Sequence, residues 1–519
     1  MENNSNQKQI QNMFVKSSGG SSLKNNEKNV FEVIRDLLYN SLGQAMIRIF
    51  QTKNLAIKFY LAIVSVSLVG LASYLTVESI LSYLSYEVIT TSRTLSETPT
   101  TFPKITLCNI NMFTSKHASE LIRQVNEMVL PSVSFFDKDQ IKYLKNKQIG
   151  EIWQVINLAA TALIFNKKYD DEYKKLLAHD FEDILISCQF NYKKCDASDF
   201  LWSFDPYYGN CYSFNTGFNS SDHQVALKES SIAGWLFGLS LELYVNFNES
   251  LNLFNDASGV ILRIGNSSFL TDQNLDGIRI PSGFRTDVAI NRAFNYIMPQ
   301  PYSECLVDSS FRTYDSEIFN LILNSAYQYS QKLCLEQCFQ RESLRYCNCT
   351  AAVFVSLFQN TRQCDNFEDI ICGLKTFSEV YLVNNFIRDH CLPLCPLECN
   401  NSIYTASLSL NVIYGNKYIN YIMQNPNVLD DFKSKTIDAD AAKQSVSYIN
   451  IYYDSLSYKL SYESPQMSVV SLLASIGGNL SLFLGVSVFS LSELIEIFIE
   501  IYFLKRTKNK STKVENFSS

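Results

Sequence analysis

Two long apolar blocks constrain this chain more than any other feature of its sequence. The first runs from Leu55 to Val77, with Lys58 as its only charge, and the second runs without any charge from Met467 to Ser492. A helix needs roughly 20 apolar residues to cross the hydrocarbon core of a bilayer. Each block therefore predicts a membrane-spanning helix, and a pair of buried core helices in a soluble protein is the weaker alternative.

Basic residues flank the two blocks at their outer ends in the sequence. Before Leu55 they are Lys8, Lys16, Lys24, Lys28, Arg35, Arg48 and Lys53, and after Leu504 they are Lys505, Arg506, Lys508, Lys510 and Lys513. Positive flanks stay in the cytoplasm, so both tails are expected inside and the long middle outside. The polar segment before Leu55 is too long for the first block to be a signal peptide.

These flanks define five predicted parts. They are a cytoplasmic region (1–54), a first transmembrane helix (55–79), an extracellular domain (80–466), a second transmembrane helix (467–504) and a cytoplasmic tail (505–519). Alternating apolar residues predict strands within 102–113, 239–248, 259–264 and 445–462, and helical spacing appears in 151–165, 171–188 and 311–346. The expected fold is an α+β membrane protein whose ectodomain has a central β-sheet surrounded by helices.

All 14 cysteines lie between Cys108 and Cys399, within the predicted ectodomain. An even number of cysteines in an oxidising compartment predicts a disulfide framework. A metal site is disfavoured because His390 is the only histidine beside a cysteine cluster, and no metal or cofactor is expected. Five sequons predict N-linked glycans on an extracellular surface, at Asn219, Asn248, Asn266, Asn348 and Asn400.

The second block is rich in Gly and Ser for a helix that faces lipid, which suits close packing or a pore. A cation that crosses a membrane must exchange its water shell for oxygens, and backbone carbonyls can supply them where the backbone is not helical. Gly485, Val486 and Ser487 could form such an extended segment, although a helix-packing Gly/Ser face is the alternative. Glu493, Glu496 and Glu500 share one helical face and suggest an aqueous inner vestibule, with Glu500 equally suited to simple solvation.

Several segments resemble the degenerin/epithelial sodium channel family, in an order and spacing that chance does not readily produce. They are FPKITLCNINMF from Phe102, the block from Ser187 to Gly217, PSGFRTDVAINRAFNYIMPQPYSEC from Pro281, the cysteine motifs CLEQC, CNC and CLPLCPLEC, and the Gly-x-Ser of the second apolar block. The layout is closest to that of acid-sensing and peptide-gated members.

The resemblance implies roles for single residues. It makes Gly485, Val486 and Ser487 the selectivity filter, Glu493 and Glu496 part of the inner vestibule, Ala474 the gating position and Ser481 an amiloride contact. It aligns Tyr86 and Tyr302 with aromatics that couple ectodomain to membrane, although ordinary core aromatics are equally possible. It also implies the disulfides Cys108–Cys211, Cys188–Cys195, Cys305–Cys399, Cys334–Cys395, Cys338–Cys391, Cys347–Cys372 and Cys349–Cys364.

One departure from the family pattern concerns gating. The family carries His-Gly before its first span, and Leu42-Gly43 stands here instead. The expected protein is a subunit of a homo- or heterotrimeric, amiloride-sensitive, sodium-selective channel of the plasma membrane, opened by a proton, a peptide or force. A non-conducting modulatory or adhesion-type subunit is the alternative, and an ATP-gated trimeric channel is a weaker one.

The remaining partner and activity classes follow from what the sequence contains. The expected partners are related subunits and the lipid bilayer, with sodium as the permeant ion, no nucleic acid and an unknown extracellular ligand. No nucleophile elbow or phosphate-binding loop is present in the sequence, so an enzyme is not expected.

Overall fold

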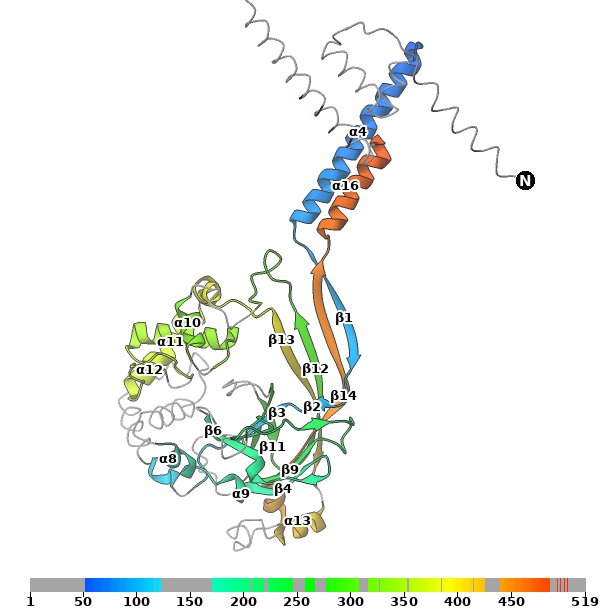
Figure 1. Cartoon of the computed structure of the whole chain (residues 1–519). Coiled ribbons are helices and arrows are strands. Elements are labelled where there is room, and N and C mark those ends of the chain that lie inside the picture. Colours follow the sequence, from blue (N-terminus) through cyan, green and yellow to red (C-terminus); the bar gives the residue numbers. More distant parts are fainter. Residues whose placement is uncertain are drawn as a thin grey trace, which may run out of the picture. The chain divides into compact units, whose positions relative to one another are not determined.

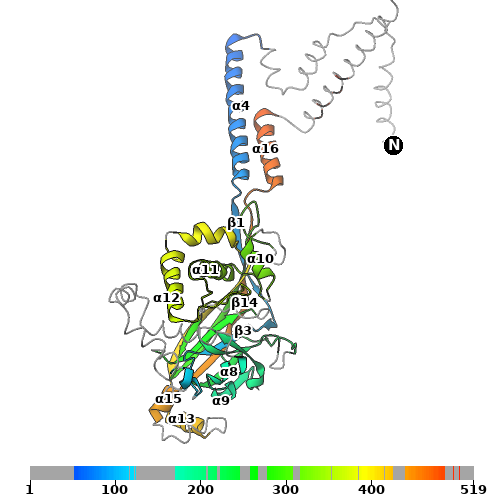
Figure 2. The same cartoon turned by 90° about the vertical axis from the view of Figure 1, so that its left-hand side faces the viewer.

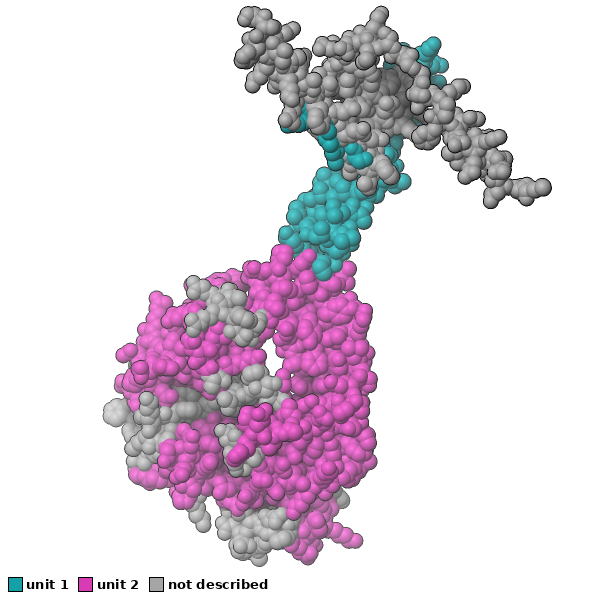
Figure 3. Space-filling model, viewed as in Figure 1, with its two compact units in different colours: residues 1–87, 465–519 teal, residues 88–464 magenta. Residues whose placement is uncertain are grey.

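The computed structural model describes residues 52–115, 117–121, 123, 170–205, 208–218, 223–245, 257–266, 277–307, 316–325, 327–351, 354–383, 385–413, 415–424, 439–485, 492, 495, 499 and 502. The chain divides into two compact units, drawn in different colours in Figure 3. Unit 1 comprises residues 1–87 and 465–519, and unit 2 comprises residues 88–464. Predictions for Leu42-Gly43, for the segment 151–165 and for Asn219 and Asn248 lie outside the described residues.

Unit 1 contains two apolar helices, α4 (Leu55–Leu84) and α16 (Val469–Leu484), which lie side by side in Figures 1 and 2. Among the described residues, α4 is the helix whose length and composition suffice to cross a membrane. It continues to Leu84 instead of ending near residue 79, because VESILSYL keeps a helix-compatible sequence up to the cap at Ser85. Helix α16 has 16 residues and is too short by itself to meet the same criterion.

Long strands form the larger sheet of unit 2. Among the described residues this sheet has seven strands, in the order β13-β12-β14-β9-β4-β5 with β1 pairing β14. Strands β12 and β14 run parallel, whereas β12 is antiparallel to β13 along its whole length. The bounds are β1 Val88–Ser96, β4 Leu185–Phe190, β5 Lys193–Lys194, β9 Leu239–Tyr244, β12 Phe284–Tyr296, β13 Asn400–Val412 and β14 Val446–Pro465.

A second sheet corrects the expectation of one central sheet. In the described part of the chain it has five strands in the order β11-β10-β3-β7-β6, and a two-stranded pair β2-β8 stands apart. The bounds are β2 Thr100–Thr101, β3 Lys104–Asn109, β6 Phe200–Asp205, β7 Gly209–Phe214, β8 Glu229–Ser230, β10 Gly259–Gly265 and β11 Ile278–Pro281. The alternation in the sequence located β3, β9, β10 and β14 but could not divide them between sheets.

One apolar core joins the two sheets. Phe102 is fully buried between them and makes edge-on ring contacts with Phe190 at 5.1 Å and Tyr453 at 5.8 Å. The Tyr453 hydroxyl donates a hydrogen bond of 2.7 Å to the Thr101 carbonyl, and burial raises the pKa of this phenol, so it stays protonated. The hydroxyl thereby satisfies a backbone acceptor inside the core.

Helices gather on one side of the long strands in unit 2 (Figure 1). Helix α11 is the longest of them, and π-helical and 3₁₀ turns replace regular helix near Pro393. The bounds are α10 Glu317–Leu323, α11 Gln331–Cys347, α12 Phe367–Lys375, η2 Thr376–Tyr381, η3 Ile387–Cys391 and η4 Leu392–Leu394. These elements, together called the helical cluster, surround a separate core that includes Phe319, Phe339 and Tyr381.

The helical prediction for 171–188 is only half right. It covers α8 (Asp171–Leu176) and α9 (Phe181–Ile184), but the chain then continues as strand β4 from Leu185. Leu185, Ile186 and Cys188 are buried against the neighbouring strand and core, and this sheet pairing overrides the local helical spacing. The remaining described elements are η1 Ala197–Asp199, α13 Asn416–Met423 and α15 Ala439–Gln444.

Candidate functional site

Helix α16 ends at the first residue of the predicted filter. Ser468 caps its start by accepting a hydrogen bond of 3.0 Å from the Ser471 amide. Its end is Gly485, whose φ of 69° and ψ of 19° lie in the left-handed region, which glycine enters without the steric cost of a Cβ. The second apolar block is therefore not one continuous helix. Val486 and Ser487 lie outside the described residues.

One face of α16 packs against α4, since the two helices contact each other. Leu472, Ile476, Leu480 and Phe483 are half-buried apolar side chains of α16 that recur at helical spacing, and Ser475, Asn479 and Leu484 are half-buried as well. On α4 the matching half-buried stripe contains small residues, and Ala72 is buried to 1% exposure. Small side chains allow two membrane helices to approach closely.

The opposite face of α16 carries exposed small residues, with the exposed aliphatic side chains of Val470, Leu473 and Leu482 beside them. The small residues follow one another at intervals of three or four positions, at Ser471, Ala474, Gly478, Ser481 and Gly485. This spacing places them in one stripe along the helix. The stripe points away from the α4-packing face and offers hydroxyls and bare backbone in place of the aliphatic side chains that lipid favours.

The other predicted site residues fall in different places. Ala474 and Ser481 lie on the exposed small-residue stripe, whereas Glu493 and Glu496 lie outside the described residues. Tyr86 follows α4 in unit 1 with a left-handed φ of 51°, and Tyr302 belongs to a turn of unit 2 in which its amide donates to the Pro299 carbonyl. Asn266, Asn348 and Asn400, the asparagines of three sequons, are exposed.

The strands that adjoin α4 and α16 in sequence pair with each other. Strand β1 follows α4 and strand β14 precedes α16, and β1 pairs β14 in the larger sheet. The Ser92 and Ser461 hydroxyls lie 3.3 Å apart across this pair. Within unit 1 the Gln466 amide donates a hydrogen bond of 2.9 Å to the Glu87 carbonyl. A displacement of either strand is therefore passed to both connections.

Arg292 is a buried cation that the sequence analysis missed. Its side chain is 6% exposed on the core face of β12, and its guanidinium donates to Glu97 at 2.9 Å and to Thr100 at 3.1 Å. The same guanidinium lies over the rings of Tyr453 at 5.2 Å and Tyr458 at 5.3 Å. It thus attaches the link between β1 and β2 to strands β12 and β14. The sequence did hold a signal for its burial: Val288, Ile290 and Arg292 stand at every second position of the strand and therefore share one face.

Seven disulfides join all 14 cysteines, in the pairs that the resemblance implies. Cys334 and Cys338, one turn apart on α11, are bonded to Cys395 and Cys391, which lie in the irregular helical segment that returns along it. Cross-links of this kind reduce the number of conformations open to the unfolded chain. They also hold the helical cluster together as one body.

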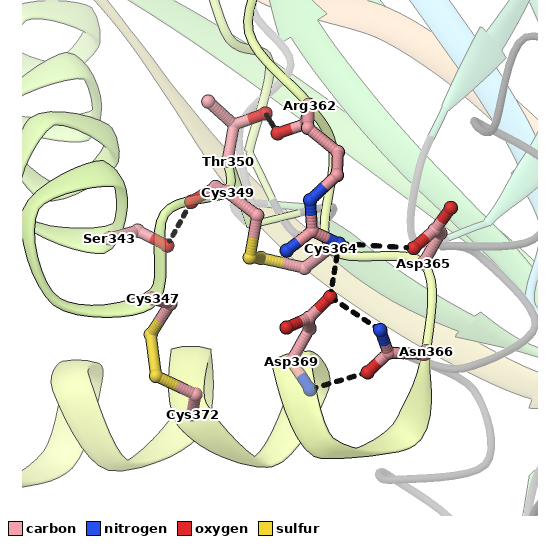
Figure 4. Close-up of polar contacts among 10 residues, drawn as sticks. All are labelled: Ser343, Cys347, Cys349, Thr350, Arg362, Cys364, Asp365, Asn366, Asp369 and Cys372. Atoms are coloured by element: carbon pink, nitrogen blue, oxygen red, sulfur yellow. Dashed lines mark hydrogen bonds and ion pairs between the residues drawn. A yellow bond between two sulfur atoms is a disulfide. The ribbon is translucent and has the colours of Figure 1, made fainter.

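Polar contacts complete the helical cluster around α12 (Figure 4). Asn366 caps this helix by accepting from the Asp369 amide at 2.9 Å, and Arg362 pairs with both Asp365 and Asp369. The hydrogen bond to Asp369 raises the pKa of Arg362 above its ordinary value. The adjacent disulfide Cys349–Cys364 fixes the loop that carries Arg362.

Comparison with known proteins decides the family. A family model described as amiloride-sensitive sodium channel matches residues 38–497. The chain belongs to this family. Its members are ion channels and not enzymes. The match argues against the alternative of an ATP-gated trimeric channel.

Individual relatives agree with the family match. The chain is 26% identical over 332 residues to the epithelial sodium channel subunit alpha of Gallus gallus, covering 63% of this chain and 48% of the relative. It is 26% identical over 328 residues to the human subunit beta (63% and 49%) and 25% identical over 356 residues to degenerin mec-10 of Caenorhabditis briggsae (68% and 46%). The chain spans about half the length of the curated relatives it matches.

Replacing Arg292 with Gln should destabilise unit 2 by about 2 kcal/mol, because the ring contacts and the buried stem are lost. Glu97 is half exposed, with 49% of its side chain accessible, so the ion pair itself contributes little after solvent screening. The control Glu97→Gln should accordingly cost less than about 0.5 kcal/mol. Unfolding of the purified chain by denaturant measures both variants, and equal losses would contradict this division.

Proposed function

We propose that this chain is a subunit of a trimeric, amiloride-sensitive, sodium-selective cation channel of the plasma membrane that opens in response to an extracellular stimulus. The observation that carries the proposal is the end of α16 at a left-handed Gly485, together with the exposed stripe of small residues that leads to it. The family match supports the sodium-channel assignment, and the relatives' printed names describe them as subunits.

Gly485, Val486 and Ser487 form the selectivity filter in this proposal. A helix that ends inside a bilayer leaves its last carbonyl groups without intrahelical partners. Such groups are tolerated at membrane depth only where they face protein or water. Three copies arranged around an axis would turn these oxygens toward a common path and replace part of the hydration shell of sodium. Glu493 and Glu496 would concentrate cations at the inner mouth.

Ala474 and Ser481 have distinct roles in this proposal. Ala474 occupies the gating position on the same stripe, about three helical turns before Gly485. Its small side chain permits the helices of three subunits to approach. Ser481 lies one turn before Gly485 on the same stripe and offers a hydroxyl to amiloride. Tyr86 and Tyr302 couple the ectodomain to the membrane helices.

The arrangement in the membrane follows from the charge of the tails. Both termini lie in the cytoplasm, α4 and the second apolar block cross the bilayer, and unit 2 is extracellular. The disulfides suit that oxidising side, and the exposed sequons carry N-linked glycans. The trimer contains three copies of this chain or this chain with related subunits.

Whole-cell recording from cells that express this chain alone tests the proposal. The stimuli screened are acid steps, amidated peptides and stretch. We expect one of them to evoke an inward current that amiloride reduces and whose reversal potential follows the sodium gradient. A current carried by chloride would contradict the filter assignment. The unmodified chain could instead reach the surface without carrying current, while the Leu42→His variant conducts. That result would indicate a modulatory subunit.

Replacing Gly485 with Ala should reduce sodium selectivity and current. A left-handed conformation costs a residue with a Cβ about 1–2 kcal/mol, so the chain at the filter would shift toward helix. Gly70→Ala provides the matched control, because Gly70 lies inside α4 with no atom within 4 Å of an added Cβ and without a left-handed backbone. Recordings at equal surface expression compare the variants. Unchanged selectivity in Gly485→Ala would count against the filter.

A further inference from the structure

A large cavity lies inside unit 2, away from the stripe on α16. Its volume is about 1010 Å³, and its walls come from β3 and β10 of the five-stranded sheet, from the start of α11 and from the start of β13. Figure 3 shows unit 2 hollowed between the helical cluster and the long strands. Pockets for small molecules usually measure about 300–1,000 Å³, so the cavity can hold a complete organic ligand.

Charged side chains line opposite walls of this cavity. On the sheet wall Arg263 and Asp205 form an ion pair of 2.7 Å, with side chains 12% and 6% exposed, and their charges cancel. Lys104 on β3 and Glu336 on α11 are both 8% exposed. Glu398 is more accessible, and one of its carboxylate oxygens accepts the Gln331 amide at 2.9 Å. Lys104 and Glu336 carry opposite charges, so among the described lining residues Glu398 is left as the more accessible negative charge.

Aromatic rings line other parts of the same cavity. Phe204, Tyr327 and Tyr404 all face the cavity. Burial raises the pKa of the Tyr327 and Tyr404 phenols, so both rings stay neutral. Tyr329 is held in place by a hydrogen bond of 2.6 Å from its hydroxyl to the Pro396 carbonyl. A cavity that contains both neutral aromatic rings and an accessible carboxylate is the kind of site that attracts organic cations.

We propose that this cavity binds a small organic cation, an ammonium or guanidinium group on an apolar body, with its charge near Glu398 and its body on the aromatic rings. The cavity joins the helical cluster to β13, which pairs β12, and β12 in turn pairs β14. A bound cation therefore alters the strand that precedes α16 in sequence. This modulatory effect rests on the proposed channel function, whereas the binding itself does not.

Protection of an introduced cysteine tests the binding. Ile403 lines the cavity on β13 and is 38% exposed, whereas Leu408 on the same strand is 43% exposed and is not part of the lining. Full-length Ile403→Cys and Leu408→Cys chains at the cell surface are labelled with a neutral, impermeant maleimide. The probes are phenylguanidine, which is cationic, and phenylurea, its neutral isostere. Because the readout is labelling, it is independent of any current.

Phenylguanidine should slow the labelling of Ile403→Cys, while phenylurea should not, and neither should affect Leu408→Cys. Glu398→Gln is then added to the Ile403→Cys chain; the new side chain keeps an oxygen that can accept from the Gln331 amide. The phenylguanidine concentration needed for protection should rise about fivefold, because one unit charge about 4 Å away in water contributes a factor of that size to binding. Glu368→Gln, an exposed carboxylate on α12 outside the lining, should leave it unchanged.

Four outcomes would overturn the proposal. They are an Ile403→Cys chain that never labels, equal protection by phenylurea, equal slowing of Leu408→Cys, and full protection in Glu398→Gln. A silent channel that nevertheless shows the expected protection would reject the conduction role alone and leave the binding site intact.

Discussion

The left-handed backbone at Gly485 is the constraint on which the account of this chain depends. Helix α16 hydrogen-bonds its own backbone as far as Leu484, and the Gly485 amide still donates back to Ser481. The last carbonyl groups of the helix need other partners, and in the proposed transmembrane position lipid would offer none. In that proposal the carbonyl groups face water or protein, as the exposed stripe before them does. A chain with an aliphatic residue at this position would have no comparable reason to stop its helix here.

Unit 2 is stiffened by long strand pairing, a buried cation and disulfides. Strand β14 is 20 residues long and runs without interruption from the core of unit 2 to its last residue, Pro465. Arg292 holds the link after β1 against β12 and β14, and the disulfides keep the helical cluster together. Stiff elements transmit a displacement, whereas flexible ones absorb it. The pairing of β1 with β14 joins the strand that follows α4 in sequence to the strand that precedes α16.

The sequence predicted the features that depend on composition and local period. The apolar block at Leu55 and the alternation in β3, β10 and β14 were both visible in it. The division of strands between two sheets was not, since it depends on pairing between distant segments. Strand β13 was missed although Tyr404, Ala406, Leu408, Leu410 and Val412 alternate with polar residues in its sequence; it is an edge strand, exposed along much of its length. Arg292 escaped because its partner Glu97 lies 195 residues away. The filter could be proposed only through the family resemblance.

Accessibility along α16 in the conducting channel tests the central claim most directly. Single cysteines are placed on the small-residue stripe at Ser471, Ala474, Gly478 and Ser481, and on the α4-packing face at Leu472, Ile476, Leu480 and Phe483. A cationic thiol reagent applied from outside should block or alter sodium current at the stripe positions, with the period of a helix, and leave the packing face unaffected. Block confined to the packing face, or equal block at both, would contradict the claim that this stripe lines the ion path.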